Sequence, residues 1–360
     1  MLENKHIRFG CNVISYGDVA ETINHSLMAE KCDFDAVTLP DHLFHPLMKD
    51  FLTEPPWEVF TVLAAIGSKT RNIRIMPVVT DSVRRHPVLL AHTIATLDHI
   101  TGGRAMLGLG AGEAFNISPL EDVKWDKPYT MLKEAVGLIK MFWASSIEKP
   151  VTFRGEYFRV NRAFLGFKPL QKPFPPIYIG GYGPKIRKLV GAEGNGWIPM
   201  MYTPKLYKRD LKLIIETAKK VGRQPKEIDP ALLTITVILP DSDKAREAII
   251  NRGRSLLALR PPLLKDLGCK EVDESLVCWR MAFTEKQKKE LLKQANAIPE
   301  RMVQKTIIAG TADDAIGQIE DFIQSGLKHL VVAPLISWFK ETVEAYRDKI
   351  IPYFREQNKK

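Results

Sequence analysis

The 360-residue sequence predicts an α/β fold, a single (β/α)8 TIM barrel with insertions, on three observations. Short apolar strands alternate with helices along most of the chain, which is the pattern of a parallel sheet. Eight strand-helix units can be counted, and no linker divides them into two halves. A closed barrel with insertions also commonly reaches this length. We therefore expect residues 1–360 to form one barrel domain.

The expected strands are short apolar segments, several of them ended by Pro or Gly. They begin near Ile7, Phe34, Ile73, Arg104, Ile177, Gly196, Ala231 and His329. The third, 73–80, contains Pro77, which is awkward because proline cannot donate to a sheet ladder. The fourth, 104–107, is too short for a helix and leads into the glycine-rich stretch 108–116.

The helices between these strands have recognisable start signals. Asp18 and Glu21 have capping-box spacing, and Thr311 and Asp314 cap a later helix in the same way. Prolines are tolerated in a first helical turn, and several expected helices follow one. The expected helices span 18–32, 57–68 after Pro55 and Pro56, 88–100 after Pro87, a segment after Asp126 and Pro128, one from Pro184, and 206–221, 241–258, 311–325 and 339–357.

Two segments depart from the alternation and are expected to be insertions, at about 145–172 and 255–300. In the first, 151–153 and 157–160 flank Arg154-Gly155-Glu156 and predict a β-hairpin. The second reads as irregular helix around the Pro261-Pro262 break.

Composition limits the classes of partner. The formal net charge is +10, from 52 basic and 42 acidic residues, which suits an anionic ligand. Lys and Arg are scattered rather than gathered into a basic stripe, so no nucleic-acid partner is expected. No segment has the roughly 20 apolar residues of a membrane helix, and the 4 cysteines form no C-x-x-C pair. We expect a cytoplasmic protein with a small-molecule substrate.

In a parallel barrel, functional residues sit at the C-terminal ends of the strands. That rule gathers Asn12, Ser15, Asp41, His42, Val79, Thr80, Glu113, Asn116, Gly180, Gly181 and Trp197 around one mouth. A His and a Glu that face each other suit general acid-base work, although His42 could instead cap a helix and Glu113 could be a solvated turn residue. The Gly180 loop precedes a helix N-terminus and suits a phosphate. No spacing indicates a metal site.

Several motifs together resemble the luciferase-like monooxygenase superfamily, and within it the branch that uses the deazaflavin coenzyme F420, especially methylenetetrahydromethanopterin reductase. They are Phe9-Gly10, Asp41-His42, Ile100 to Arg104 leading into Gly108 to Glu113, Leu165 to Pro169, and Ile177 to Pro184.

The resemblance implies that the deazaflavin lies across the strand ends and that hydride moves to or from its C5 atom. It also implies a non-prolyl cis peptide in the third strand, which here would be the Pro77–Val78 bond. The implied catalytic residues are His42, Glu113 and Asn12. The implied cofactor-binding residues are Asp41, His42, Pro77, Val78, Val79, Thr80, Gly110, Ala111, Gly112, Glu113, Asn116, Gly180 and Gly181.

Two departures leave the substrate open. Asn12 stands where the methanopterin reductases carry a glutamate, and Glu113 where they carry an aspartate. The Gly-Glu-Ala-x-Asn ending instead resembles the sugar-phosphate and secondary-alcohol dehydrogenases of the branch. Those enzymes have a Trp shortly after the His, where this chain has Pro46 and Leu47.

Four functions therefore remain open. The leading one is an F420-dependent oxidoreductase, with methylenetetrahydromethanopterin among its candidate substrates. The others are an F420-dependent alcohol or sugar-phosphate dehydrogenase, an FMN-dependent monooxygenase, and a ligand-binding barrel without catalysis. The family usually forms homodimers or larger homo-oligomers, which we expect here as well.

Overall fold

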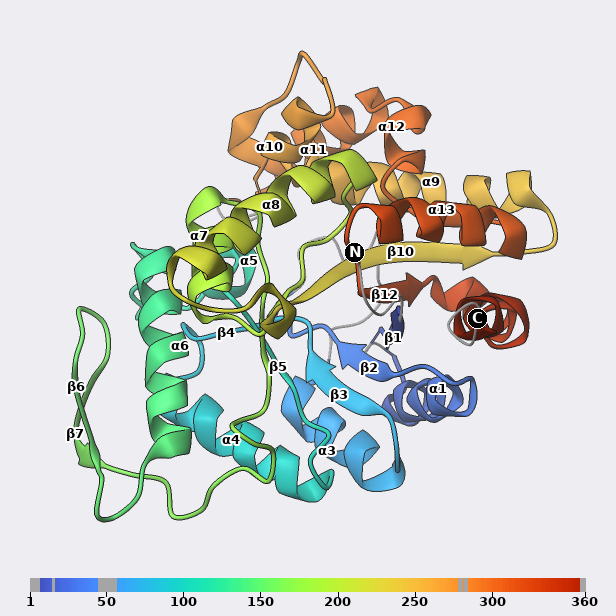
Figure 1. Ribbon diagram of the computed structural model, residues 1–360. Helices are drawn as coiled ribbons and strands as arrows, with labels where there is room; N and C mark the ends of the chain where they lie inside the picture. Colours follow the sequence, from blue (N-terminus) through green and yellow to red (C-terminus); the bar gives the residue numbers. More distant parts are fainter. Residues whose placement is uncertain (1–6, 15–16, 45–56, 278–280, 282–283, 357–360) are drawn as a thin grey trace.

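The computed structural model describes residues 7–14, 17–44, 57–277, 281 and 284–356 (Figure 1). Ser15, Pro46, Leu47, Pro55, Pro56 and Gln357, which entered the sequence-based expectations, lie outside these ranges.

Parallel strands curl into a barrel within a ten-stranded sheet, as expected from the sequence. Neighbours around the barrel follow the order of the chain, and β12 pairs with β1. β3 meets β5 through a bridge between Ile75 and Ala105, where Met106 N–H donates to Ile75 O at 2.9 Å. The barrel strands are β1 (Arg8–Asn12), β2 (Ala36–Leu39), β3 (Arg74–Pro77), β5 (Leu107–Gly110), β8 (Ile177–Ile179), β9 (Gly196–Trp197), β10 (Asp229–Ile238) and β12 (His329–Pro334).

Two further strands of the same sheet were not predicted. β4 (Thr80–Asp81) pairs with β5, and β11 (Ile308–Gly310) pairs with β10. Thr80 was expected at the end of the third strand, 73–80, rather than in a separate strand, and no strand was expected at β11.

Helices cover the outside of the barrel (Figure 1). They are α1 (Val19–Lys31), α3 (Val59–Lys69), α4 (Pro87–Ile100), α6 (Pro128–Ala144), α7 (Pro184–Glu193), α8 (Pro204–Lys220), α9 (Ser242–Ala258) and α13 (Ala312–Gln324). The closing helical segment consists of α14 (Phe339–Ala345), a π-helical turn (Tyr346–Ile350) and α15 (Ile351–Glu356). Within the described residues, no helix is both long and apolar enough to cross a membrane.

Helix capping follows the expectation at one site and departs from it at another. Thr311 and Asp314 form the reciprocal capping box of α13. At α1, Asp18 accepts the N–H of Ala20 at 2.8 Å, but Glu21 does not return a bond and lies 3.8 Å from His25. The capping-box expectation for α1 is therefore wrong, because Glu21 points along the helix to its neighbour one turn later.

The two irregular segments lie outside the barrel. β6 (Val151–Arg154) and β7 (Arg159–Ala163) form the expected antiparallel hairpin, a separate two-stranded sheet that projects away from the barrel (Figure 1). The later segment contains α10 (Pro261–Asp266), α11 (Glu285–Ala297) and α12 (Glu300–Gln304), which pack against α9.

The turn after β3 contains a non-prolyl cis peptide bond between Val78 and Val79. The expected Pro77–Val78 bond is thus wrong by one position. Val78 N–H donates to Leu39 O at 2.7 Å, so the ladder with β2 continues through Val78, and the chain changes direction only after it. Alternate residues of β3 direct their backbone N–H groups toward β5, and Pro77 is at one of these positions. Because the pairing with β5 ends at Ile75, the missing N–H of Pro77 is tolerated.

The Val79 side chain lies close to the backbone of the neighbouring strands at several glycines. A Cβ atom on Gly110 would lie 2.8 Å from the Val79 side chain, and one on Gly180 would lie 3.2 Å from it. A Cβ atom on Gly108 would lie 2.1 Å from Pro77 O, a backbone atom that cannot rotate away. The glycines therefore make room for the turn that follows β3.

Substituting Gly108 should open the barrel at this point. We expect Gly108→Ala to lower the free energy of unfolding by about 2 to 3 kcal/mol, because the methyl group overpacks two backbones. Gly137→Ala in α6 is the control, since a Cβ atom there meets nothing within 4 Å. It should leave stability unchanged or raise it by up to about 1 kcal/mol. Urea unfolding measures both, and equal effects of the two variants would contradict this packing.

A buried charge cluster lies at the N-terminal ends of the strands, opposite the mouth. The carboxylate of Asp229 lies 2.5 Å from Arg8 Nη2, accepts the Tyr178 hydroxyl at 2.5 Å, and lies 3.3 Å from His329 Nδ1. Burial would raise the pKa of the Asp229 carboxyl, but His329, Arg8 and Tyr178 outweigh burial and lower it to about 2. Gly10 makes room, since its Cβ would lie 3.1 Å from His329 Nε2.

Because its pKa is lowered by folding, the Asp229 carboxylate stabilises the fold above the unfolded pKa of about 3.9 and loses that contribution as the pH falls toward 2. We expect Asp229→Asn to be strongly destabilised near pH 6. The difference in the free energy of unfolding between the variant and the wild type should shrink by about 2 kcal/mol as the pH falls from 5 to 2. Urea unfolding across this range tests the expectation, and a difference that stays constant with pH would contradict it.

Candidate functional site

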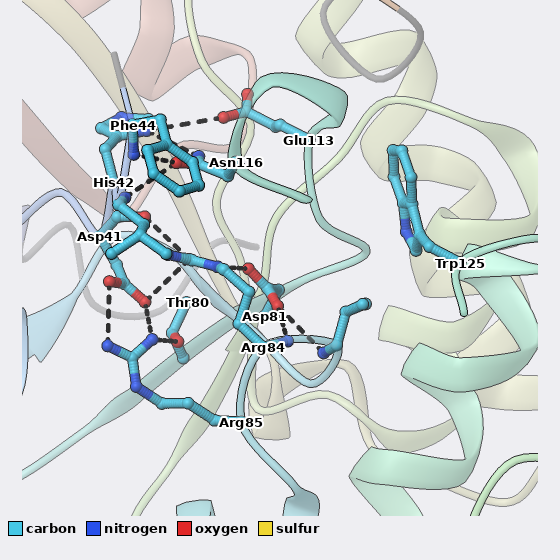
Figure 2. Close-up of polar contacts among 12 residues, drawn as sticks. Asp41, His42, Phe44, Thr80, Asp81, Arg84, Arg85, Glu113, Asn116 and Trp125 are labelled. Carbon is cyan, nitrogen blue, oxygen red and sulfur yellow. Dashed lines mark hydrogen bonds and ion pairs between the residues drawn. The ribbon is translucent and has the colours of Figure 1, made fainter. Parts of the chain in front are cut away.

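The C-terminal ends of β1, β2, β4 and β5 bring the sequence-predicted polar residues together at one mouth of the barrel (Figure 2). Asn12 ends β1, Asp41 and His42 follow β2, Thr80 begins β4, and Glu113 precedes the short helix α5 (Ala114–Ile117). The strand-end rule thus located a real cluster, and hydrogen bonds link several of its members.

Asp41 is held by two arginines. Its carboxylate lies 3.1 Å from Arg84 Nη2 and 2.5 Å from Arg85 Nη1, and the Asp41 side chain is 4% exposed. Arg84 also donates to the Asp41 backbone carbonyl at 3.0 Å. A buried carboxylate needs such partners, since an unpaired one would cost several kcal/mol. Asp41 therefore anchors the segment that carries His42.

The arginines are themselves fixed by the turn after β4. Asp81 accepts the N–H groups of Val83 and Arg84 and binds Arg84 Nε at 2.6 Å. Arg85 donates to Thr80 Oγ1 at 3.3 Å and pairs with Glu58 at 2.8 Å. Neither arginine was expected from the sequence to belong to the site, since Asp41 lies far from both in the chain.

His42 lies beside Glu113 and beside Asn116 of α5 (Figure 2). Its Nδ1 is 3.0 Å from the amide nitrogen of Asn116 and 3.8 Å from Glu113 Oε2. The Phe115 ring stacks on it, with centroids 5.3 Å apart. The side chains of His42 and Glu113 are 23% and 36% exposed, so a molecule bound at the mouth can reach them.

Asn12 has a different setting. It is buried, and its Oδ1 accepts the hydroxyl of Thr38 at 2.8 Å. Asn12 carries no ionisable group, so it can offer hydrogen bonds but cannot supply a proton in the way that a glutamate can.

The glycine loop, 110–112, leads directly into Glu113. Gly112 has a φ of 88°, a conformation that favours glycine, and a Cβ atom there would lie 2.4 Å from Ile117. Trp125 braces the loop by donating its indole N–H to Ala111 O at 3.0 Å. Trp125 lies across from the His42 group in Figure 2, and the sequence analysis did not identify it.

The Gly180-Gly181 loop joins β8 to α7. Gly181 has a φ of 133°, and Gly183 precedes α7 without a side-chain cap. Uncapped amides at a helix N-terminus are a suitable environment for a phosphate. Trp197, expected at the mouth, is fully buried and instead supports this loop by donating to Gly181 O at 3.1 Å.

The mouth carries hydrogen-bonding side chains and backbone amides. The part of the chain that the structure describes contains no group of three His, Cys, Asp or Glu side chains placed to hold a metal ion. The mouth instead offers a His-Asn-Glu group on one side, a glycine loop on another and an uncapped helix N-terminus beyond them.

Residues 6–329 match the model of the luciferase-like monooxygenase family. Similar proteins include a 5,10-methylenetetrahydromethanopterin reductase from Archaeoglobus fulgidus, 29% identical over 350 residues that cover 96% of this chain and 99% of that protein. An F420-dependent glucose-6-phosphate dehydrogenase from Nakamurella multipartita is 30% identical over an alignment of 365 positions, which covers 97% of each protein.

Among solved structures, an F420-dependent secondary alcohol dehydrogenase in complex with an F420-acetone adduct superposes with a TM-score of 0.80 at 26% identity, covering 96% of this chain and 98% of that one. The coenzyme F420-dependent tetrahydromethanopterin reductase from Methanopyrus kandleri has the same TM-score at 24% identity, covering 97% and 99%, and shows the shared fold. Together with the barrel and the matched range, these likenesses show that the chain belongs to the luciferase-like monooxygenase family.

Proposed function

We propose that this chain is an F420-dependent oxidoreductase whose active site is the mouth formed by β1, β2, β4 and β5. The observation that carries the proposal is the group of His42, Asn116 and Glu113 at the end of the glycine loop, which Trp125 braces. The relatives support it, because F420-dependent dehydrogenases align over nearly their whole length. Bound F420 would supply a ring carbon, C5, that gives or takes a hydride.

The residues of the mouth have distinct roles in this proposal. Asp41, Thr80, Gly112 and Glu113 would lie beside the ring or its ribityl chain, and the Gly180-Gly181 loop with the α7 N-terminus would hold the phosphate. The remaining proposed contacts come from Pro77, Val78, Val79, Gly110 and Ala111.

His42 is the acid-base partner of a substrate oxygen or nitrogen, and Glu113 assists it. Asn12 contributes a hydrogen bond. Orientation of the substrate against the ring supplies most of the acceleration, as holding reactants in line typically does.

The substrate is a small organic molecule. Methylenetetrahydromethanopterin, an alcohol and a sugar phosphate are the candidates, since each is named by a relative that aligns with nearly the whole chain. We further propose one barrel domain that carries the segments 145–172 and 255–300 as insertions, acts in the cytoplasm and assembles as a homodimer or a larger homo-oligomer.

An FMN-dependent monooxygenase is the second candidate, because the matched family and some structural neighbours are of that kind. Equilibrium titration of the purified protein separates the two. We expect F420 to bind with a dissociation constant at least about 100-fold lower than that of FMN, a difference of roughly 2.7 kcal/mol. Tight binding of FMN without binding of F420 would overturn the proposal.

Loss of the His42 side chain should remove catalysis and leave the fold intact. We expect His42→Ala to lower kcat/KM by about 100-fold or more, the usual size of an acid-base contribution. His92→Ala is the control, since His92 is exposed on α4 and its ring contacts Phe167. Turnover of F420 with a panel of an alcohol, a sugar phosphate and a methylene-pterin measures both variants.

Retention of activity by His42→Ala within about threefold of the wild type, with cofactor binding intact, would exclude His42 as the acid-base residue. Binding of F420 without any turnover across the panel by the wild type would favour the ligand-binding barrel.

A further inference from the structure

The amide of Asn116 has only one orientation that satisfies its neighbours. Its Oδ1 lies 2.9 Å from the backbone nitrogen of Leu43 and 3.2 Å from that of Phe44. Backbone N–H groups only donate, so the atom that they contact must be the oxygen. The other amide atom is therefore the NH2 group, and it faces His42 Nδ1 at 3.0 Å.

This orientation decides which ring nitrogen of His42 carries the hydrogen. The NH2 group of Asn116 is a donor, so Nδ1 must accept with its lone pair. In the neutral imidazole the hydrogen then resides on Nε2. Asn116 is 2% exposed and Phe115 stacks on the imidazole, so neither the amide nor the ring is free to turn away.

We propose that Asn116 is a positioning residue that holds neutral His42 in the tautomer with its hydrogen on Nε2. The inference rests on the proposed function for its catalytic consequence, but not for the tautomer itself. In this form His42 offers an N–H donor to the oxygen or nitrogen of the substrate. Nε2 is therefore the atom at which His42 meets the substrate in its acid-base role.

Asn116 and Glu113 have opposite effects on the protonation of His42 Nδ1. A hydrogen on Nδ1 would confront the NH2 group of Asn116 at 3.0 Å, whereas the Glu113 carboxylate at 3.8 Å would favour a charged ring. The amide is the nearer group and both of its polar atoms are engaged by the protein. These contacts assign Asn116 to orientation of His42 rather than to direct binding of the cofactor.

The tautomer is measurable in the protein without cofactor or substrate. Histidine-labelled protein gives separate ring-nitrogen signals by two-bond proton–nitrogen correlation, and His42→Gln identifies those of His42. At a pH where the ring is neutral, we expect Nδ1 to be unprotonated and Nε2 to be protonated. A wild-type ring with its hydrogen on Nδ1 would overturn the proposal directly.

Asn116→Asp should reverse the arrangement. One carboxylate oxygen can still accept from Leu43 and Phe44, but the other now faces Nδ1 as an acceptor and requires a hydrogen there. Asn161→Asp adds the same charge on an exposed hairpin residue and is the matched control. We expect a hydrogen on Nδ1 in Asn116→Asp and the wild-type pattern in Asn161→Asp.

Kinetics distinguish positioning from cofactor binding. We expect Asn116→Asp to lower kcat by about 10-fold or more while the dissociation constant of F420 changes by less than about threefold. An unchanged tautomer together with a 10-fold or larger loss of F420 affinity would instead make Asn116 a cofactor ligand. If the wild type lacks F420 turnover altogether, the proposed function fails, and the ring-nitrogen signals still decide the tautomer.

Discussion

The buried ion pairs of Asp41 with Arg84 and Arg85 are the constraint on which the mouth of the barrel depends. They tie the segment after β2 to the turn after β4, so two strand ends become one rigid unit. The Asp41 side chain is 4% exposed, and a carboxylate buried there without its arginines would cost several kcal/mol. Because His42 directly follows Asp41, the position of the proposed acid-base residue derives from these arginines rather than from its own contacts alone.

The rest of the site is fitted around a backbone that approaches its neighbours closely. The Val79 side chain projects toward Gly108, Gly110 and Gly180. The sequence suggested that glycines here let a ligand approach the backbone, and they also leave space for the turn after β3. Close packing of this kind leaves little freedom for the strand ends. The charge cluster around Asp229 stabilises the opposite end of the barrel, so stability and the candidate chemistry occupy separate ends.

The sequence predicted the barrel and the main residues of the mouth, because strand periodicity and the strand-end rule depend on local pattern and on topology. It could not predict the partners of Asp41, since Arg84 and Arg85 lie more than 40 residues away in the chain. It misplaced the cis bond by one residue, because only the hydrogen bond of Val78 to Leu39 shows where β3 ends. β11, which pairs with β10 at the edge of the barrel, was also missed.

The central claim is that F420 binds across the strand ends with its reactive carbon beside His42. A crystal structure of the protein with F420 tests it most directly. The account predicts the deazaflavin ring against the glycine loop with C5 on the side of His42, and the phosphate at Gly180-Gly181 and the α7 N-terminus. A ring bound away from His42, or a phosphate held elsewhere, would contradict it.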